Sequence, residues 1–173
     1  MDSDIEIGYG EMTLRIREAK KADLPDVLTI EQDSFDAPWC ERDFVRHCGQ
    51  SSAGLLVAEF DQQVIGFLVY EQRLGKLRVL NVAVTEDYRR HGIGTHLIDE
   101  LIAALCPDKP RAIVVNVRET NDAAIAFFAK LGFRSTSFLR EFYDDQANAI
   151  RLEWELRGHR AIENSEARAD NEK

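Results

Sequence analysis

The sequence predicts a single mixed α/β domain in two or three layers. Segments with the two-residue periodicity of strands alternate along the chain with segments that have the 3.6-residue periodicity of helices. The chain has 173 residues, 45% of them hydrophobic, which is enough for one domain with a substantial core. We expect this domain to cover residues 12–157. An N-terminal tail would precede it at 1–11, and a polar, disordered tail would follow at 158–173.

The first half of the domain predicts a strand, two helices and three further strands. TLRIREA alternates as a short strand. Asp23 can cap a helix that has Pro25 in its first turn and runs to about Phe35. After a break at DAPW, a second short helix covers ERDFVRHC. GLLVAEF and VIGFLVYE, joined by a DQQ turn, indicate a hairpin, and LRVLNVAV is a third apolar run.

The second half predicts two helices and three strands. A long helix carries a buried stripe made of Leu97, Ile98, Leu101, Ile102 and Leu105. RAIVVNV follows as a buried strand. Asn121 opens another helix, and Gly132 is placed to cap its C-terminus. FRSTSFL and AIRLEWEL are typical of an antiparallel pair that closes the sheet.

Composition excludes several classes of protein. A net charge of -9 and a pI near 5.0 argue against nucleic-acid binding, and they favour basic partners or small anions held at a local positive site. The three cysteines, Cys40, Cys48 and Cys106, form no CxxC pair and indicate reduced cytoplasmic thiols. The first residues lack the apolar core of a signal peptide, and no apolar run reaches membrane-spanning length. The histidines show no metal-ligand pattern, so we expect no metal.

The segment AVTEDYRRHGIGTHL, at 83–97, joins a strand to a helix and predicts an anion site. The first N–H groups of a helix lack internal partners, and the helix dipole places positive charge there. Gly92 and Gly94 allow close approach to the backbone, and Arg89, Arg90 and His91 add side-chain donors. The segment lacks both the lysine of a Walker loop and the GxGxxG spacing. An ordinary glycine turn with solvated arginines remains the alternative interpretation.

The motif Arg89-x-x-Gly92-x-Gly94 resembles the acetyl-CoA pyrophosphate loop of the GNAT acyltransferases. Downstream, NVRETNDAAIAFFAKLGF is similar to the second GNAT signature. Upstream, IEQDSFDAPWCERDF resembles the acceptor-binding segment of the RimI-like ribosomal-protein-alanine N-acetyltransferases, and LNVAV also matches that group. The resemblance covers roughly 14–156. It implies the GNAT acyl-CoA N-acyltransferase fold, with a mixed central sheet and helices on both faces.

The resemblance also implies a cosubstrate, acetyl-CoA, and the residues that hold it. In this family the strand before the loop splays away from the next strand, and its backbone bonds the pantetheine arm. Asn121 would contact the pantetheine as well as cap its helix, and Phe128 would lie beside the cofactor. The residues expected to bind the pyrophosphate and the pantetheine through the strand and the loop are Val82, Ala83, Val84, Arg89, Arg90, His91, Gly92, Ile93, Gly94 and Thr95.

The chain departs from the RimI-like pattern at two positions. Asn116 stands where these enzymes carry a glutamate base, and Phe128 stands where they carry a tyrosine acid. Neither side chain exchanges a proton at neutral pH. An α-amine with a pKa of about 7.7–8.0 is already neutral in roughly 20–30% of molecules near pH 7.4, whereas a lysine is neutral in only ~0.1%. The departures therefore favour an α-amine acceptor, or deprotonation through a water held by Asn116.

Asn116 and Tyr143 are the candidate catalytic residues. A lone amide in an apolar strand is also typical of a structural hydrogen bond, and Tyr143 could instead be a packed surface tyrosine. Tyr70 and Glu71 are weaker candidates. The sequence favours a solvated helix position for Glu31 over a contact with the acceptor. Trp39 is expected to pack the acceptor loop and not to touch the substrate.

These expectations define the predicted function. The leading one is acetyl transfer from acetyl-CoA to the amino terminus of a protein or peptide, a ribosomal protein being one candidate. A small-amine acetyltransferase is the alternative within catalysis. A non-catalytic acyl-CoA-binding module is the alternative from another class, because the usual base and acid are missing. We expect a cytoplasmic monomer or weak dimer that binds neither nucleic acid nor membrane.

Overall fold

The structure is a computed structural model that describes residues 3–6, 13–48, 50–105 and 111–156. The strands in these ranges are β1 (Ser3–Glu6), β2 (Thr13–Glu18), β3 (Ala53–Phe60), β4 (Gln63–Arg73), β5 (Lys76–Val84), β6 (Ala112–Arg118), β7 (Arg134–Leu139) and β8 (Ala149–Glu155). The α-helices are α1 (Leu24–Ser34), α2 (Glu41–Cys48), α3 (Ile93–Ala103) and α4 (Asp122–Lys130), and two 3-10 turns are η1 (Lys21–Asp23) and η2 (Glu86–Tyr88).

One sheet contains all of these strands, in the order β1-β2-β3-β4-β5-β6-β8-β7. Adjacent strands are antiparallel except β5 and β6, which are parallel and are connected through α3. The elements predicted between 13 and 156 are confirmed. The segment 1–11 was expected to be a tail, yet Ser3–Glu6 pairs with β2 as an edge strand. A strand of four residues is too short to show a clear alternation. The tail predicted at 158–173 lies outside the described residues.

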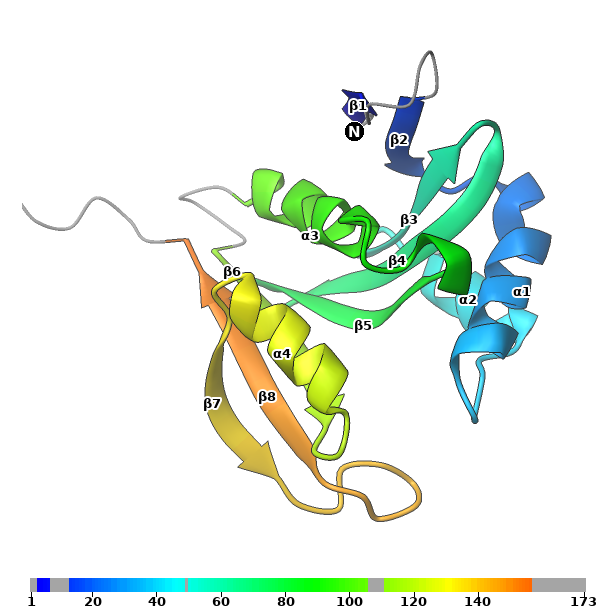
Figure 1. The fold of residues 1–173 in the computed structure, drawn as a ribbon. Helices are drawn as coiled ribbons and strands as arrows, with labels where there is room; N and C mark the ends of the chain where they lie inside the picture. Colours follow the sequence, from blue (N-terminus) through cyan, green and yellow to red (C-terminus); the bar gives the residue numbers. More distant parts are fainter. Residues whose placement is uncertain (1–2, 7–12, 49, 106–110, 157–173) are drawn as a thin grey trace, which may run out of the picture.

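Helices cover both faces of the sheet, as the predicted fold requires (Figure 1). α3 and α4 pack on one face, where Leu97, Leu101 and Phe128 join the larger hydrophobic cluster. α1 and α2 pack on the other face, where Val27 and Phe44 join the smaller one. In the described ranges, no helix is long and apolar enough to cross a membrane. The same ranges contain no group of three His, Cys, Asp or Glu side chains that could hold a metal ion.

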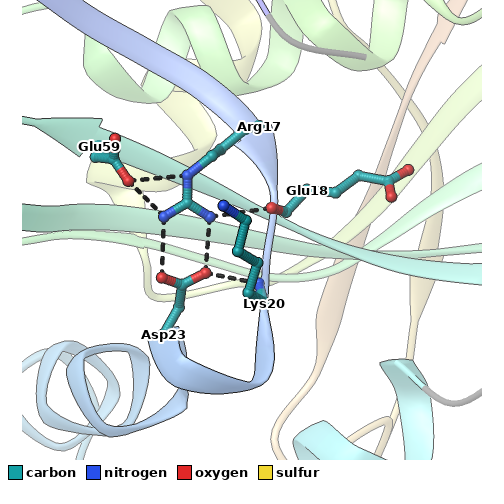
Figure 2. A network of polar contacts seen from close by, with 5 residues as sticks. All are labelled: Arg17, Glu18, Lys20, Asp23 and Glu59. Atoms are coloured by element: carbon teal, nitrogen blue, oxygen red, sulfur yellow. Dashed lines mark hydrogen bonds and ion pairs between the residues drawn. The ribbon is translucent and has the colours of Figure 1, made fainter. Parts of the chain in front are cut away.

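A buried network of ion pairs centred on Arg17 connects the first elements of the domain (Figure 2). Arg17 in β2 is only 6% exposed. Its guanidinium donates to both carboxylate oxygens of Asp23, at 2.7 and 2.9 Å, and its Nε donates to Glu59 in β3 at 2.9 Å. The backbone N–H of Lys20 also donates to Asp23, at 2.6 Å. The network therefore joins β2, η1 and β3 just before α1 begins.

The two parallel strands separate after a short paired segment. β5 and β6 pair only over three positions, Leu77 with Ile113 through Val79 with Val115. Beyond this point β5 continues to Val84 and β6 to Arg118, but no further pairs form, and the strands diverge (Figure 1). A bulge in the β4–β5 ladder lies at the same level, because Tyr70 pairs with Val79 while Val69 pairs with Asn81. The sheet thus opens between β5 and β6.

Candidate active site

The loop from β5 to α3 has the backbone form of an anion site. Arg90 and Gly92 both have positive φ, 69° and 87°, and α3 begins at Ile93. The N–H of His96 donates to the carbonyl of Gly92 at 3.0 Å, as the first bond of the helix. The N–H groups of the three residues between them therefore have no partner within the helix, and the dipole adds positive charge there.

The basic side chains of this loop, Arg89, Arg90 and His91, have different contacts. Arg89 Nε donates to the carbonyl of Val84 at 2.8 Å, and its guanidinium reaches Ser34 Oγ in α1 at 3.2 Å. Arg89 thus holds the loop against the end of β5 and against α1. His91 Nδ1 lies 2.9 Å from the carbonyl of Arg89. Arg90 and His91, like Arg89, are exposed to solvent, where an anion could reach them.

Gly94 has a packing role in addition to the one that the sequence predicts. A Cβ at this position would lie 3.3 Å from Phe127 Cζ, in α4. The close approach of α3 to α4 therefore favours a residue without a side chain, because a Cβ here would need Phe127 to shift slightly. Thr95, one residue later, is half-buried, and Ile93 is buried in the larger cluster.

The open edge of β5 faces the gap left by β6. Thr85 N–H donates to the carbonyl of Ile65 at 2.9 Å, so these residues form a hydrogen-bonded antiparallel pair. The alternation along the ladder then directs the backbone groups of Ala83 toward β4. It directs those of Val82 and Val84 toward the side from which β6 has diverged. An extended ligand can lie there as an additional strand would.

The structure brings the two candidate catalytic residues together. Asn116 directly follows the last position of β6 that pairs with β5, so it lies where the strands diverge. Tyr143, in the loop between β7 and β8, donates its O–H to the backbone carbonyl of Asn116 at 3.4 Å. The side-chain oxygen of Asn116 accepts a hydrogen bond from Arg151 Nε in β8 at 3.1 Å. Its Nδ2 is buried and has no partner among the described residues.

Tyr143 remains a protonated phenol near neutral pH. Burial raises the pKa of its hydroxyl, while the charge of Arg118 opposes the shift. The guanidinium of Arg118 lies 4.4 Å from the centre of the Tyr143 ring and also donates to Asp145 at 2.8 Å. Tyr143 is therefore held in a fixed position as a hydrogen-bond donor next to Asn116.

The two predicted contacts from α4 have different environments. Asn121 caps the helix, because its Oδ1 accepts the N–H of Ala124 at 3.0 Å, and its side chain is exposed at the helix start. Phe128 is only 2% exposed and packs edge-to-face against Phe127 and Phe133. The ring at the position of the family's acid is therefore part of the core.

Glu31 is not the solvated helix residue that the sequence favoured. It is 1% exposed, and its carboxylate accepts hydrogen bonds from the backbone N–H of Trp39 at 2.8 Å and from Asn81 at 2.9 Å. Burial raises the pKa of this carboxyl, although the two hydrogen bonds oppose the shift. Trp39 packs against Phe44 and His47, as predicted for the connection between α1 and α2.

The weaker candidates lie in other environments. Glu71 lies 3.5 Å from Arg78 as an ion pair on neighbouring strands. Tyr70 lines a cavity of about 180 Å³ between the sheet and the end of α3, and its hydroxyl has a pKa raised by burial. Arg151 and Asn81, which contact Asn116 and Glu31, are the site residues that sequence reasoning missed. Their contacts depend on strand register and on packing between elements.

Comparison with known proteins agrees with this geometry. The model of the acetyltransferase (GNAT) family matches residues 24–133. An N-alpha-acetyltransferase of Sulfurisphaera tokodaii is 30% identical over 148 residues, which cover 78% of this chain and 89% of that protein. The [ribosomal protein bS18]-alanine N-acetyltransferase of Escherichia coli is 30% identical over 138 residues, covering 78% and 93%.

The fold is also shared with solved structures. The crystal structure of the ribosomal-protein-S18-alanine N-acetyltransferase from Escherichia coli has a TM-score of 0.75 and 28% identity, covering 87% of this chain and 97% of that one. The family match spans the loop at the start of α3, the open edge of β5 and the whole of α4. The chain therefore belongs to the acetyltransferase (GNAT) family and is an acetyl-CoA-dependent N-acyltransferase.

Proposed function

We propose that the protein acetylates the α-amine of a protein or peptide N-terminus by direct attack of the amine on the thioester of acetyl-CoA. Two kinds of relative support this acceptor class, one named for N-alpha-acetylation and one for acetylation of a ribosomal-protein alanine. A ribosomal protein is accordingly one candidate acceptor, in the cytoplasm.

The observation that carries the proposal is the pair of residues where the RimI-like enzymes place their base and acid. Asn116 takes up no proton, and Phe128 is a buried hydrocarbon ring. An amine that relies on the site for deprotonation would be a poor acceptor here. An N-terminal α-amine is substantially neutral near pH 7.4, since its pKa is about 7.7–8.0.

The residues of the chain fit acetyl-CoA along one continuous path. The N–H groups at the start of α3, with Arg90 and His91 exposed beside them, would bind the pyrophosphate. The outward backbone groups of Val82 and Val84 would hold the pantetheine in the gap between β5 and β6, and Asn121 would contact it from α4. The thioester would then lie near Asn116, where the strands meet.

Each bound substrate has one task in the reaction. The thioester supplies an acyl carbon and a leaving thiol of pKa about 8.5, which can depart as a thiolate with little help. The neutral amine forms the new C–N bond, the C–S bond breaks, and the ammonium proton passes to solvent. Tyr143 is placed to donate a hydrogen bond near this centre, because its hydroxyl already contacts the backbone of Asn116. Positioning of the two substrates supplies the rate that a base would otherwise add.

A panel of acceptors tests the proposed function. N-terminal peptides, lysine peptides with blocked N-termini, and small amines are incubated with acetyl-CoA, and acetyl transfer is detected by mass spectrometry. We expect transfer to the N-terminal peptides, and the spectra of digested products will place the acetyl group on the α-nitrogen. Transfer to small amines alone contradicts the proposed acceptor class, and binding of acetyl-CoA without transfer to any amine contradicts catalysis.

A further inference from the structure

We propose that Arg151 is a positioning residue. It binds the side-chain oxygen of Asn116 and so turns the amide nitrogen toward the bound substrates, and position 116 then acts only as a hydrogen-bond donor. The inference rests on the proposed function and adds a rule for acceptor selection. Under this rule, position 116 offers a hydrogen-bond donor and no base, so the site uses amines that are already neutral.

The contact between the two side chains fixes the orientation of the amide. Asn116 in β6 and Arg151 in β8 are register partners in the antiparallel ladder, so their side chains leave the sheet on the same face. Arg151 Nε donates to Asn116 Oδ1 at 3.1 Å. A guanidinium only donates hydrogen bonds, so the amide atom that faces it must be the oxygen. The amide nitrogen therefore points away from Arg151.

The presented nitrogen is a donor that the protein leaves without a partner. Asn116 Nδ2 is buried and donates to no described residue, which is an unusual state for a buried N–H group. Asn116 lies directly after the last paired position of β5 and β6, and Tyr143 contacts its backbone carbonyl. A buried donor that has no partner in the described part of the chain, on β6 where it parts from β5, suits a carbonyl oxygen of a bound substrate.

The carboxylates in the adjacent row of the sheet and in the nearby loop are paired with cations. Strand register places Glu71, Arg78 and Glu153 in the row next to Asn116, with Val114 between them. Glu71 lies 3.5 Å from Arg78, and Glu153 is paired with Lys76. In the loop beside the site, Asp145 accepts a hydrogen bond from Arg118, which also lies over the Tyr143 ring. Each of these carboxylates is therefore in contact with a cation.

The proposal predicts an interaction between substitutions at 116 and 151. A glutamate introduced by Asn116→Glu alone would form an ion pair with Arg151, and its lowered pKa would make it a poor base. The double variant Asn116→Glu/Arg151→Met removes the cation and leaves the carboxylate free. We expect the double variant, but not the single one, to gain at least about tenfold in kcat/KM on lysine peptides, because general-base assistance contributes ~10²–10⁴-fold.

The pH profile gives a readout that a purely structural role would not change. The wild-type protein and Asn116→Glu should both show a kcat/KM midpoint that follows the α-amine of the acceptor peptide. The double variant should add a midpoint set by the protein, which stays fixed when the peptide is exchanged. A fixed midpoint or a gain on lysine peptides in Asn116→Glu alone overturns the proposal, and so does a double variant identical to the single one.

Single substitutions at 151 separate positioning from folding. Arg151→Met should lower kcat/KM about tenfold or more, and Arg151→Lys, which keeps a donor and a charge, should recover part of the loss. A thermal melt with and without acetyl-CoA checks that each variant folds and binds. Arg134→Met, which removes an exposed cation from the neighbouring strand β7, is the matched control and should leave activity unchanged. Equal losses in the Met and Lys variants with normal melts overturn the proposal.

Two further outcomes locate the carbonyl and keep the two proposals distinct. For Asn116→Ala, a lower kcat with an unchanged peptide KM places the donor on the thioester carbonyl, whereas a higher peptide KM with an unchanged kcat places it on a carbonyl of the acceptor. Neither change overturns the role of Arg151 and Asn116. A wild-type protein that acetylates no N-terminal peptide contradicts the proposed function, whereas an active wild type with no interaction between 116 and 151 contradicts this inference alone.

Discussion

The buried carboxylate of Glu31, in α1, accepts a hydrogen bond from the side chain of Asn81, in β5, at 2.9 Å. Its second oxygen accepts the backbone N–H of Trp39 at 2.8 Å. One side chain therefore joins a helix, the connection that follows the helix and the bulged part of β5, at the level where the sheet opens. If the acceptor binds at this connection, as the resemblance implies, Glu31 would link the acceptor side of the proposed site to its cofactor side.

Glu31→Gln should weaken this link. An amide keeps only one accepting oxygen, so one of the two buried donors loses its partner. We expect the free energy of unfolding to fall by about 1–3 kcal/mol. The KM for the peptide should rise while the thermal shift caused by acetyl-CoA stays the same. Gln32→Ala, at the exposed neighbouring position, is the control. An unchanged melting temperature in Glu31→Gln would show that the carboxylate does not hold these elements together.

The network around Arg17 should make stability depend on acidic pH. The hydrogen bond from Arg17 lowers the pKa of Asp23 in the folded state. The stability that ionised Asp23 contributes is therefore complete above the pKa of about 3.9 that an aspartate has in the unfolded chain. This stability is lost as the pH falls through the lower pKa of the folded state. Asp23→Asn leaves the buried guanidinium with Glu59 and one weaker partner, and it should destabilise the fold by about 1–3 kcal/mol at pH 7.

Denaturant unfolding between pH 2 and pH 7 measures this effect. The Asp23→Asn variant should lose less stability on acidification than the wild type does. Asp33→Asn removes an exposed carboxylate from α1, the helix that follows Asp23, and should follow the wild type. If Asp23→Asn and the wild type lose stability in parallel below pH 4, the Arg17–Asp23 pair does not carry the dependence.

Acetyl-CoA should stabilise the fold through the loop at the start of α3. At a concentration of ~100 Kd, the ligand should add about 2.7 kcal/mol, which is visible as a rise in Tm. Arg90→Glu places a negative charge on an exposed side chain beside the N–H groups and should reduce the rise. Arg73→Glu makes the same change at the other end of the β4–β5 hairpin and should not. A melt that neither acetyl-CoA nor CoA moves would reject the anion site.

The close contact of Gly94 with Phe127 explains the choice of Arg90 for this test. Any side chain at 94 would press on α4 as well as on the ligand. A loss of binding in a Gly94 variant would therefore not distinguish a displaced helix from a blocked anion site, whereas Arg90 points into solvent.

Phe128→Tyr should raise the turnover rate or leave it unchanged, because the hydroxyl would stand where the family donates a proton to the leaving sulfur. The ring is buried between Phe127 and Phe133, so the added hydroxyl should also destabilise the fold by about 1–3 kcal/mol if it finds no partner. Phe133→Tyr makes the same change in the same cluster and should affect stability without changing turnover. A Phe128→Tyr protein that folds, binds acetyl-CoA and yet is inactive would contradict the arrangement of the site.

Periodicity predicts most of this fold, because burial on one face decides where strands and helices form. The same periodicity also indicates that Glu31 is buried, although the sequence analysis favoured a solvated position for it. Val27, Ile30 and Glu31 are spaced by three and four residues, which places the carboxylate on the buried face of α1. The short edge strand β1 gave no such signal, because its residues depend on pairing with β2 for their conformation.

The contact between Asn116 and Arg151 could not be read from the sequence. Both strands were predicted, but the residue opposite Asn116 depends on register, and a shift by one position would turn Arg151 to the other face. The anion loop, by contrast, depends on local backbone conformation at glycines and a helix start. Local chemistry of that kind is visible in a single segment, whereas contacts between distant strands require the structure.

In the proposed reaction, the amine must be neutral before it meets the enzyme. The most direct test is the pH profile of kcat/KM for two acceptor peptides whose α-amine pKa values differ. Without a protein base at 116, the rate should climb through the ionisation of each peptide, near pH 8, and the midpoint should shift with the peptide. A midpoint that stays fixed when the peptide is exchanged would show that a group of the protein takes the proton, and it would contradict the account.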